Sequence, residues 1–179
     1  MPFPHEAKLT LSETIASPII RAMEIILKKH ASAKLTIAGF GESRVSLEKL
    51  VKDLKLSDSV SFLGKVSDEV KVKLLGESWV FAQPSFMEGW GMSVIEANAC
   101  GTPVVASNVT GLRDSVRNPE TGYLVEYGNP KAFAEKLDLF LENEALRKRM
   151  GKNSINWAKN FSWDKVSHDW LEIITHYVS

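Results

Sequence analysis

The stretch 83–108 constrains the fold more than any other part of the chain. It reads QPSFMEGWGMSVIEANACGTPVVASN, and apolar runs at 79–82 and 103–106 lie before it and near its end. Such short apolar runs are typical of buried strands. The loop between them carries two glycines, and the segment Ser93 to Cys100 after it predicts a helix that ends at Gly101. The order is therefore strand, glycine loop, helix and strand.

Two carboxylates bracket this glycine loop. Glu88 precedes Gly89 and Gly91, and Glu96 follows, with seven residues between the two glutamates. In an open parallel sheet such a loop lies at the carboxyl edge of its strand, where ligands bind. The next helix directs free N–H groups at the loop, which suits an anion. Carboxylates repel phosphate but accept hydrogen bonds from sugar hydroxyls, so the pattern favours a ligand that carries both groups.

Strand and helix patterns alternate along the rest of the chain. Strands are expected at 8–11, 34–38, 60–63, 79–83, 103–106 and 123–125. Helices are expected at 17–30, 45–54, 68–77, 93–100, 111–116, 130–142, 144–160 and beyond 162, with Ser17, Ser67, Asn129 and Ser162 as capping residues. We predict an α/β fold in one domain, 1–179: a doubly wound, mostly parallel Rossmann-like sheet with helices on both faces and a helical C-terminal tail.

Composition excludes several classes of protein. Lys and Arg together number 22, as do Asp and Glu. The net charge is therefore zero, which gives no indication of a nucleic-acid partner. No apolar run reaches the roughly 18 residues of a membrane span, and the N-terminus lacks a signal-peptide pattern. The single cysteine, Cys100, favours a reducing compartment, and we expect a cytoplasmic location. Its apolar neighbours predict an inert thiol.

Other familiar site motifs are incomplete or absent. In the run 39–44, GFGESR, the third glycine of a dinucleotide fingerprint is replaced by Arg44. A tight turn and a ligand loop both remain open for this segment. The histidines have no ligand spacing, and with one cysteine no metal site is predicted. These histidines are His5, His30, His168 and His176.

The segment 84–108 resembles the signature block of retaining glycosyltransferases with the GT-B fold, in family 4, the glycosyl transferases group 1. The resemblance includes the E-x7-E pair, Glu88 and Glu96. Further blocks that resemble the family follow in its order, at 33–41 (AKLTIAGFG), 60–68 (VSFLGKVSD), 120–128 (ETGYLVEYG) and 161–163 (FSW). The likeness runs from about 17 to 177. This ordered set is more specific than the glutamate pair alone.

The resemblance covers the C-terminal of the family's two Rossmann-like domains, which holds a nucleotide-diphosphate-sugar donor. It implies that Glu88 is the catalytic residue and hydrogen-bonds the sugar hydroxyls, and that Glu96 takes the ribose hydroxyls. Backbone N–H groups toward the sugar and diphosphate are implied for Gly89, Trp90, Gly91 and Met92. The base is expected against Gly64, Lys65 and Val66, with the phosphates bordered by Gly39 and Gly41.

The resemblance also implies partners and chemistry. A sugar would pass to an acceptor hydroxyl with retained configuration, without a cofactor or metal beyond the donor substrate. An N-terminal acceptor-binding domain is the implied partner, and any peripheral membrane association would come through it. The family's basic pair for the diphosphate has no clear match, because the first strand looks missing or truncated. Lys8 is the nearest basic residue, and Arg21 falls inside a predicted helix.

One alternative belongs to a different class. The chain would then be a non-catalytic module that binds a nucleotide or a partner protein. The absent strand and basic pair favour this alternative. It predicts an exposed apolar patch where another domain or protein sits.

Overall fold

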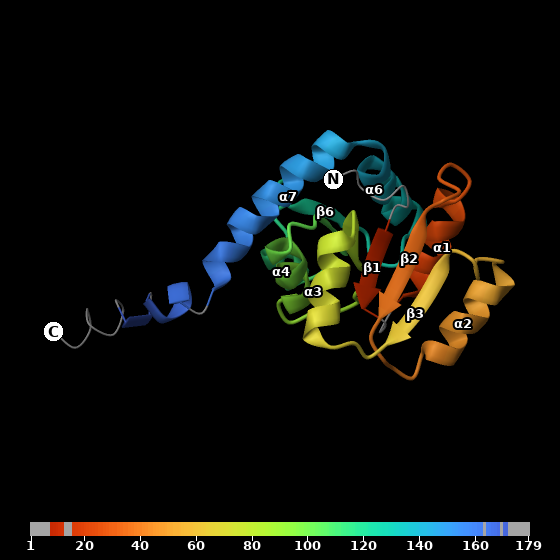
Figure 1. Ribbon diagram of the computed structural model, residues 1–179, viewed down its shortest axis with the longest axis horizontal. Helices are drawn as coiled ribbons and strands as arrows, with labels where there is room; N and C mark the ends of the chain where they lie inside the picture. The colour runs from red at the N-terminus through yellow and green to blue at the C-terminus, as the bar shows by residue number, and fades with distance from the viewer. Residues whose placement is uncertain (1–7, 13–15, 163, 169, 172–179) are drawn as a thin grey trace.

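A six-stranded parallel sheet forms the centre of the described structure (Figure 1). The computed structural model describes residues 8–12, 16–162, 164–168 and 170–171. The strand order is β3-β2-β1-β4-β5-β6, and every neighbouring pair is parallel. The strands are β1 (Lys8–Ser12), β2 (Lys34–Ala38), β3 (Val60–Gly64), β4 (Val80–Gln83), β5 (Val104–Ser107) and β6 (Gly122–Val125).

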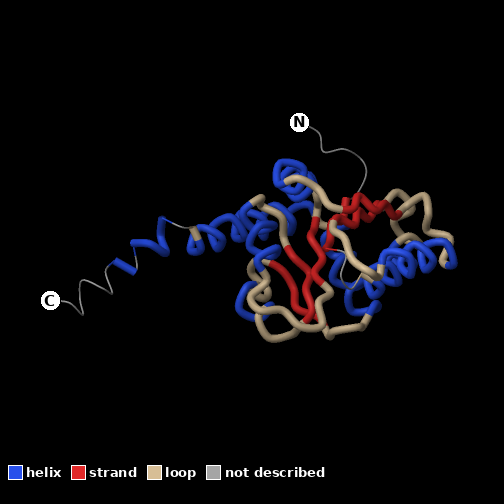
Figure 2. The backbone as a smooth tube through the Cα atoms, turned by 90° about the horizontal axis from the view of Figure 1, so that it is seen from below, coloured by secondary structure: helices blue, strands red, loops and turns tan. Residues whose placement is uncertain are grey.

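Helices cover both faces of the sheet, as predicted. One apolar cluster joins the sheet to α1 (Ser17–Ile26), α2 (Arg44–Asp53) and α6 (Pro130–Glu142). A second cluster joins it to α3 (Asp68–Glu77), α4 (Met92–Ala99) and α5 (Leu112–Ser115). Helix α7 (Glu144–Ala158) packs on α4 and continues into the 3-10 helix η2 (Lys159–Phe161). The described residues beyond η2, 164–168 and 170–171, extend away from the body (Figure 2).

The expectation that the first strand is missing or truncated is wrong. β1 lies at the centre of the sheet, paired with β2 on one side and β4 on the other. Its sequence alternates leucine with polar residues, whereas a strand in a parallel sheet usually reads as a continuous apolar run. Leu9 is nevertheless fully buried. The short strand expected at 8–11 is confirmed.

Capping patterns located most helix starts. Val70 N–H donates to Ser67 Oγ at 3.4 Å and Ala132 N–H to Asn129 Oδ1 at 3.1 Å. Lys165 N–H donates to Ser162 Oγ at 3.3 Å. The prediction for Ser17 is wrong, because the N-cap of α1 is the buried Ala16 and Ser17 is already helical.

The aromatic side chains of the tail divide into two groups. Trp157 is half-buried, whereas Trp170 is 60% exposed and so lies outside the core. His5, Trp163 and His176 fall outside the described residues. Within the described ranges, no helix is long and apolar enough to cross a membrane.

Candidate functional site

The strand order reverses direction between β1 and β4. From β1 the chain builds the sheet outward to β3, and from β4 it builds in the opposite direction to β6. In an open α/β sheet, ligands bind outside the carboxyl ends of the strands at such a reversal. The glycine loop follows β4, so it lies at the edge where this rule places a ligand.

A cleft of about 200 Å³ opens at this edge of the sheet. Its walls come from the ends of β2 and β3 and from α3 and α4. It brings together four residues that the sequence singled out: Gly39, Lys65, Val66 and Glu96. The remaining lining residues are Ala38, Phe40, Lys71, Leu74, Leu75, Phe81 and Ser93. The lining is therefore mostly apolar, with its polar groups on α3, α4 and the loop after β3.

The other predicted residues border this cleft or lie in the neighbouring loop. Gly39 N–H donates to the carbonyl of Gly64 at 2.8 Å, so the loops after β2 and β3 are bonded to each other. Gly41 is not part of the cleft lining. The glycine loop after β4 holds Glu88, Gly89, Trp90 and Gly91, and the last predicted residue, Met92, begins α4.

The amino end of α4 connects the glycine loop to the cleft. Gly91 caps this helix in the left-handed region, with φ at 76°. A Cβ on Gly91 would lie 2.7 Å from Ser115 Oγ and 2.8 Å from Leu112 Cδ2, so a larger residue would strain the backbone and displace these side chains. The first N–H groups of a helix have no intrahelical acceptor, and those of Met92 and Ser93 have none among the described residues. This helix end suits an anion.

Two neighbouring side chains hold Glu88. It is half-buried, and its Oε2 accepts from Gln83 Nε2 and Ser85 Oγ, each at 3.3 Å. Gln83 Nε2 also donates to Ser85 Oγ at 2.8 Å. Gln83 is the last residue of β4, so this strand orients the Glu88 carboxylate.

The side chain of Trp90 turns toward the C-terminal helices. Its ring packs edge-on against that of Phe161, with 4.6 Å between the ring centroids, and the rings of Phe161 and Trp157 lie 4.8 Å apart in the same measure. Trp157 Nε1 donates to the carbonyl of Ser115 at 2.9 Å, and the guanidinium of Arg117 lies 4.4 Å from its ring. A contact between Trp90 and a ligand would therefore come from its backbone.

Lys71 was missed by the reasoning from sequence. Its Nζ lies 2.9 Å from Oε1 of Glu96 and 3.1 Å from Oδ1 of Asp68. The hydrogen bond to Glu96 raises the pKa of Lys71, so the ammonium is charged throughout the neutral range. Because Lys71 and Glu96 lie 25 positions apart in the sequence, no local pattern pairs them.

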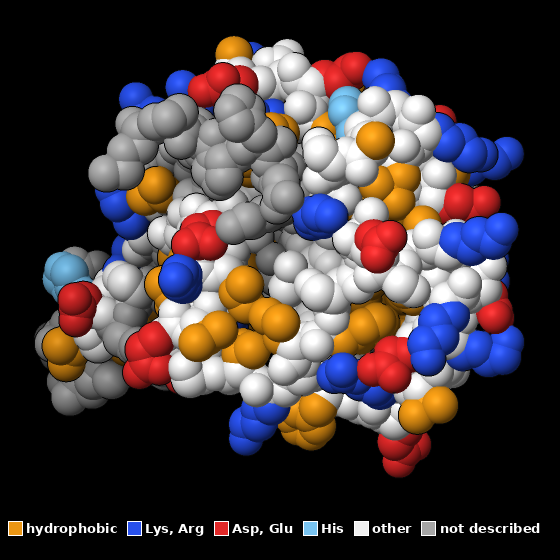
Figure 3. Space-filling model, turned by 45° about the vertical axis from the view of Figure 1, so that its right-hand side comes forward, with side chains coloured by type: hydrophobic (Ala, Val, Ile, Leu, Met, Phe, Trp, Pro, Cys, Tyr) orange, Lys and Arg blue, Asp and Glu red, His pale blue; other side chains and the backbone are white. Residues whose placement is uncertain are grey.

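Several exposed apolar side chains lie in the loops after β2 and β4 or in the first turns of the helices that follow them. Phe40 and Val45 follow β2, and Phe86, Met87 and Met92 follow β4. Each of these five is more than half exposed. Figure 3 shows one face of the protein, on which hydrophobic groups gather among charged ones.

The family model for "Glycosyl transferases group 1" matches residues 16–157. The chain belongs to the glycosyl transferases group 1 family. Its fold agrees with the Rossmann-like architecture of the GT-B enzymes, and the recognition made from the E-x7-E block and its companions is confirmed.

Two related glycosyltransferases are about a third identical to this chain over the matched residues. An uncharacterized glycosyltransferase of Methanocaldococcus jannaschii is 35% identical over 87% of this chain and 40% of its own length. A D-inositol 3-phosphate glycosyltransferase of Streptomyces avermitilis is 36% identical over 88% of this chain and 36% of its own length. The chain thus spans less than half the length of these relatives.

A solved structure of TarM has the same fold. TarM of S. aureus, crystallised as a G117R mutant with Fondaparinux, alpha-GlcNAc-glycerol and UDP, superposes with a TM-score of 0.85 at 25% identity. The match covers 96% of this chain and 36% of TarM.

The sequence offered two basic residues for the diphosphate, Lys8 and Arg21, and Lys8 does not lie at the carboxyl edge of the sheet. Lys8 is the first residue of β1 and pairs in register with Lys34, the first residue of β2. It therefore lies at the amino edge of the sheet, opposite the glycine loops. Arg21 lies on α1, exposed to solvent, as predicted for a helical position.

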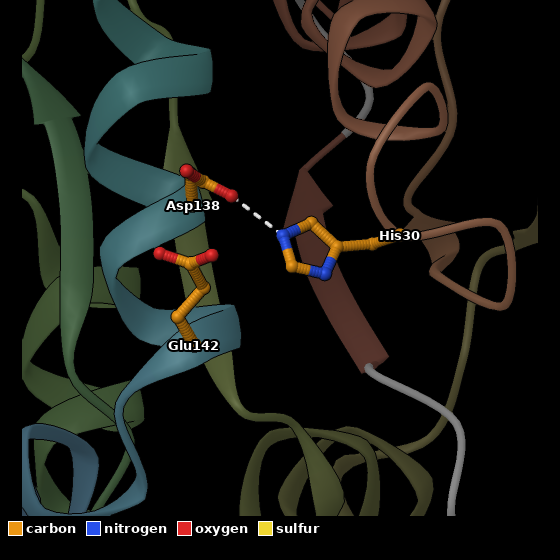
Figure 4. Close-up of side chains that lie close together, drawn as sticks. All are labelled: His30, Asp138 and Glu142. Atoms are coloured by element: carbon orange, nitrogen blue, oxygen red, sulfur yellow. Dashed lines mark hydrogen bonds and ion pairs between the residues drawn. The ribbon is translucent and has the colours of Figure 1, made fainter.

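A cluster of titratable residues lies away from the cleft, between α1 and α6 (Figure 4). His30 Nε2 lies 2.5 Å from Asp138 Oδ1, and Lys29 Nζ lies 2.8 Å from Asp138 Oδ2. Lys29 also forms an ion pair with Glu142. His30, Asp138 and Glu142 are close enough to share a metal ion, but the Lys29 ammonium already binds both carboxylates. The sequence did not indicate this cluster, because His30 and Asp138 lie 108 positions apart.

Proposed function

We propose that this chain is the donor-binding part, the C-terminal domain, of a retaining glycosyltransferase that moves a sugar from a nucleotide-diphosphate sugar to an acceptor hydroxyl. One observation carries the proposal. The cleft that contains Glu96 meets the free amino end of α4 at the carboxyl edge of the sheet. A carboxylate for hydroxyls and N–H groups for an anion are the two features that such a donor requires.

Each part of the donor has a proposed place. The base lies against the apolar wall that includes Phe40 and Val66, and the ribose hydroxyls donate to Glu96. The diphosphate lies at the amino end of α4, where N–H groups stabilise the negative charge that develops on the leaving group. Glu88, which Gln83 and Ser85 orient, takes the sugar hydroxyls.

An acceptor domain completes the proposed enzyme. The exposed apolar side chains at the carboxyl edge, among them Phe86 and Met87, would be covered by it. Closure of two domains over the donor excludes water, which protects the sugar from hydrolysis. The length of the relatives leaves room for such a domain. UDP is a candidate donor nucleotide, because it accompanies TarM.

A second candidate function has one observation in its favour. Among the described residues that line the cleft, only Lys65 and Lys71 are basic, and Lys71 is paired with Glu96. A non-catalytic module that binds a nucleotide or a partner protein would need no further positive charge. Such a module would bind its ligand without transferring a sugar.

Calorimetry with UDP-, GDP- and ADP-glucose tests the donor site. We expect one of them to bind, and Glu96→Ala to weaken it about 10- to 100-fold, because hydrogen bonds to a charged group contribute about 1.5–3 kcal/mol. Glu135→Ala, an exposed acid on α6, is the control and should leave binding unchanged. No heat with any of the three donors would count against the site.

Transfer separates the two candidates. The acceptor-binding half of a group 1 relative is added to this chain together with the donor that binds and an alcohol acceptor. Appearance of the glycoside with retained configuration supports the transferase. Binding without any transfer, across several acceptor halves, favours the non-catalytic module.

A further inference from the structure

The cleft has a charge arrangement that depends on one lysine. Two lysines and one glutamate line it: Lys65, Lys71 and Glu96. The net charge of the lining is therefore one positive with Lys71 in place and zero without it. An uncompensated Glu96 would repel a phosphorylated ligand in a half-buried cleft, where charges are screened less than in water.

The geometry of the pair leaves Glu96 available to a ligand. Lys71 Nζ contacts Oε1, and no hydrogen bond to Oε2 occupies the second oxygen among the described residues. A carboxylate has about four lone-pair positions, so one oxygen remains for hydroxyl donors. Lys71 and Glu96 are each 36–38% exposed, so a ligand in the cleft can reach both.

Lys71 is itself held in place. Its ammonium lies between Asp68 of its own helix and Glu96 of α4. Asp68 is 92% exposed and does not line the cleft, so its charge is largely screened by water. The lysine thus bridges α3 to α4 at the cleft wall.

We propose that Lys71 is a positioning and specificity residue of this cleft. It fixes the Glu96 carboxylate with one oxygen open to a ribose diol, and it offsets the carboxylate charge so that the cleft accepts an anionic nucleotide in preference to the neutral nucleoside. This inference rests on the proposed donor site and assigns to it a residue outside the glutamate pair.

A purely structural ion pair between α3 and α4 makes a different prediction. Loss of such a pair would loosen the cleft for every ligand alike. The proposed role instead changes the ratio between charged and uncharged ligands. The informative quantity is therefore the ratio of affinities for a nucleoside diphosphate and its own nucleoside.

The test measures UDP, GDP and ADP and their nucleosides by calorimetry on the 179-residue chain and its Lys71→Met variant. For the nucleotide that binds, we expect Lys71→Met to weaken the diphosphate about tenfold and the nucleoside less than about threefold, with the difference shrinking at high salt. Lys71→Arg should restore the ratio. Lys73→Met, an exposed lysine on the same helix, is the matched control and should change neither affinity.

A double variant separates charge from hydrogen bonding. Glu96→Gln combined with Lys71→Met returns the lining to the native net charge, so the ratio of diphosphate to nucleoside should return close to the native value. Discrimination against the 2′-deoxy nucleotide should be lost in this double variant, because the ribose no longer has its carboxylate acceptor. Recovery of both quantities, or of neither, overturns the proposal.

The two possible failures differ in the native chain. If UDP, GDP and ADP all fail to bind the unmodified protein, the donor site itself is wrong and this inference falls with it. If one binds, but Lys71→Met weakens the diphosphate and its nucleoside equally, the donor site stands and Lys71 has only a structural role.

Discussion

The backbone carbonyl of Glu88 packs against Gly111 so closely that no side chain fits between them. A Cβ on Gly111 would overlap the carbonyl oxygen of Glu88 and would lie 2.7 Å from that of Gly89. The backbone of Gly111 is also left-handed, with φ at 84°. The loop after β5 thus packs against the glycine loop after β4, backbone against backbone.

Gly111→Ala should therefore destabilise the protein and displace the glycine loop. Alanine would be strained in the left-handed conformation, and its Cβ would overlap the backbone of the glycine loop. Because these two costs add to each other, we expect a loss of about 2–5 kcal/mol in the free energy of unfolding. Urea unfolding followed by tryptophan fluorescence measures it.

Gly128→Ala is the matched control for this prediction. Gly128 has a similar φ of 70°, but a Cβ there would meet nothing within 4 Å. Its loss should be only about 1–2 kcal/mol, from strain alone. Equal losses for the two variants would show that the close approach of the Glu88 carbonyl to Gly111 adds nothing to the cost of a Cβ there.

The cluster between α1 and α6 predicts a pH dependence of stability. Burial raises the pKa of Asp138, but the hydrogen bonds from Lys29 and His30 outweigh it, so the pKa lies below the usual value of 3.8. A depressed pKa contributes stability above the unfolded pKa, and that contribution is lost as the pH falls through the folded pKa. Thermal melts of the wild type from pH 6 downward should lose this contribution below about pH 4.

Asp138→Asn should remove that part of the acid sensitivity, with the largest effect on stability at neutral pH. Asp53→Asn, which breaks an exposed ion pair with Lys49 on α2, is the control and should change the curve little. A wild-type curve and an Asp138→Asn curve that run parallel from pH 6 to pH 2 would contradict the assignment.

Local signals were sufficient for most of the fold. The bounds of α3 (Asp68–Glu77) and α6 (Pro130–Glu142) match the expected ranges, because an acidic first turn, a capping side chain or a proline marks each helix start. β1 was underestimated, because its burial comes from strands on both sides rather than from its own composition. The bulk of the architecture therefore follows from patterns within single elements.

The candidate site was predictable in part. Glu96, Lys65 and Val66 lie in the cleft because the carboxyl ends of parallel strands share one edge. Lys71 and Gly111 depend on contacts between distant elements, and neither stands out in its own segment. Sequence motifs identify the residues that a loop presents to a ligand. The residues that support the loop through contacts with distant elements can be identified only from the structure.

The contact of Trp90 with Phe161 predicts that the C-terminal helices stabilise the glycine loop. Phe161→Ala removes two aromatic contacts at once, and we expect a loss of about 1–3 kcal/mol in unfolding free energy, with weaker binding of the donor. Urea unfolding and donor calorimetry measure the two effects. Phe86→Ala removes one exposed ring that contacts only Tyr127 among the described aromatic residues, and should cost less than about 1 kcal/mol. A Phe161→Ala variant with native affinity would show that the loop holds its shape without the tail.

Glu88→Gln tests the proposed contact with the sugar. Glutamine keeps the shape of the side chain, and the native hydrogen bonds from Gln83 and Ser85 are long, at 3.3 Å. We therefore expect the unfolding free energy to change by less than about 1 kcal/mol. The affinity for the nucleotide-sugar should fall about tenfold, because a charged acceptor of sugar hydroxyls is lost. The affinity for the free nucleoside diphosphate should hold or rise, since one negative charge near the phosphates is removed. Calorimetry with each ligand gives both values, and an equal loss for the two ligands would place Glu88 at the nucleotide rather than at the sugar.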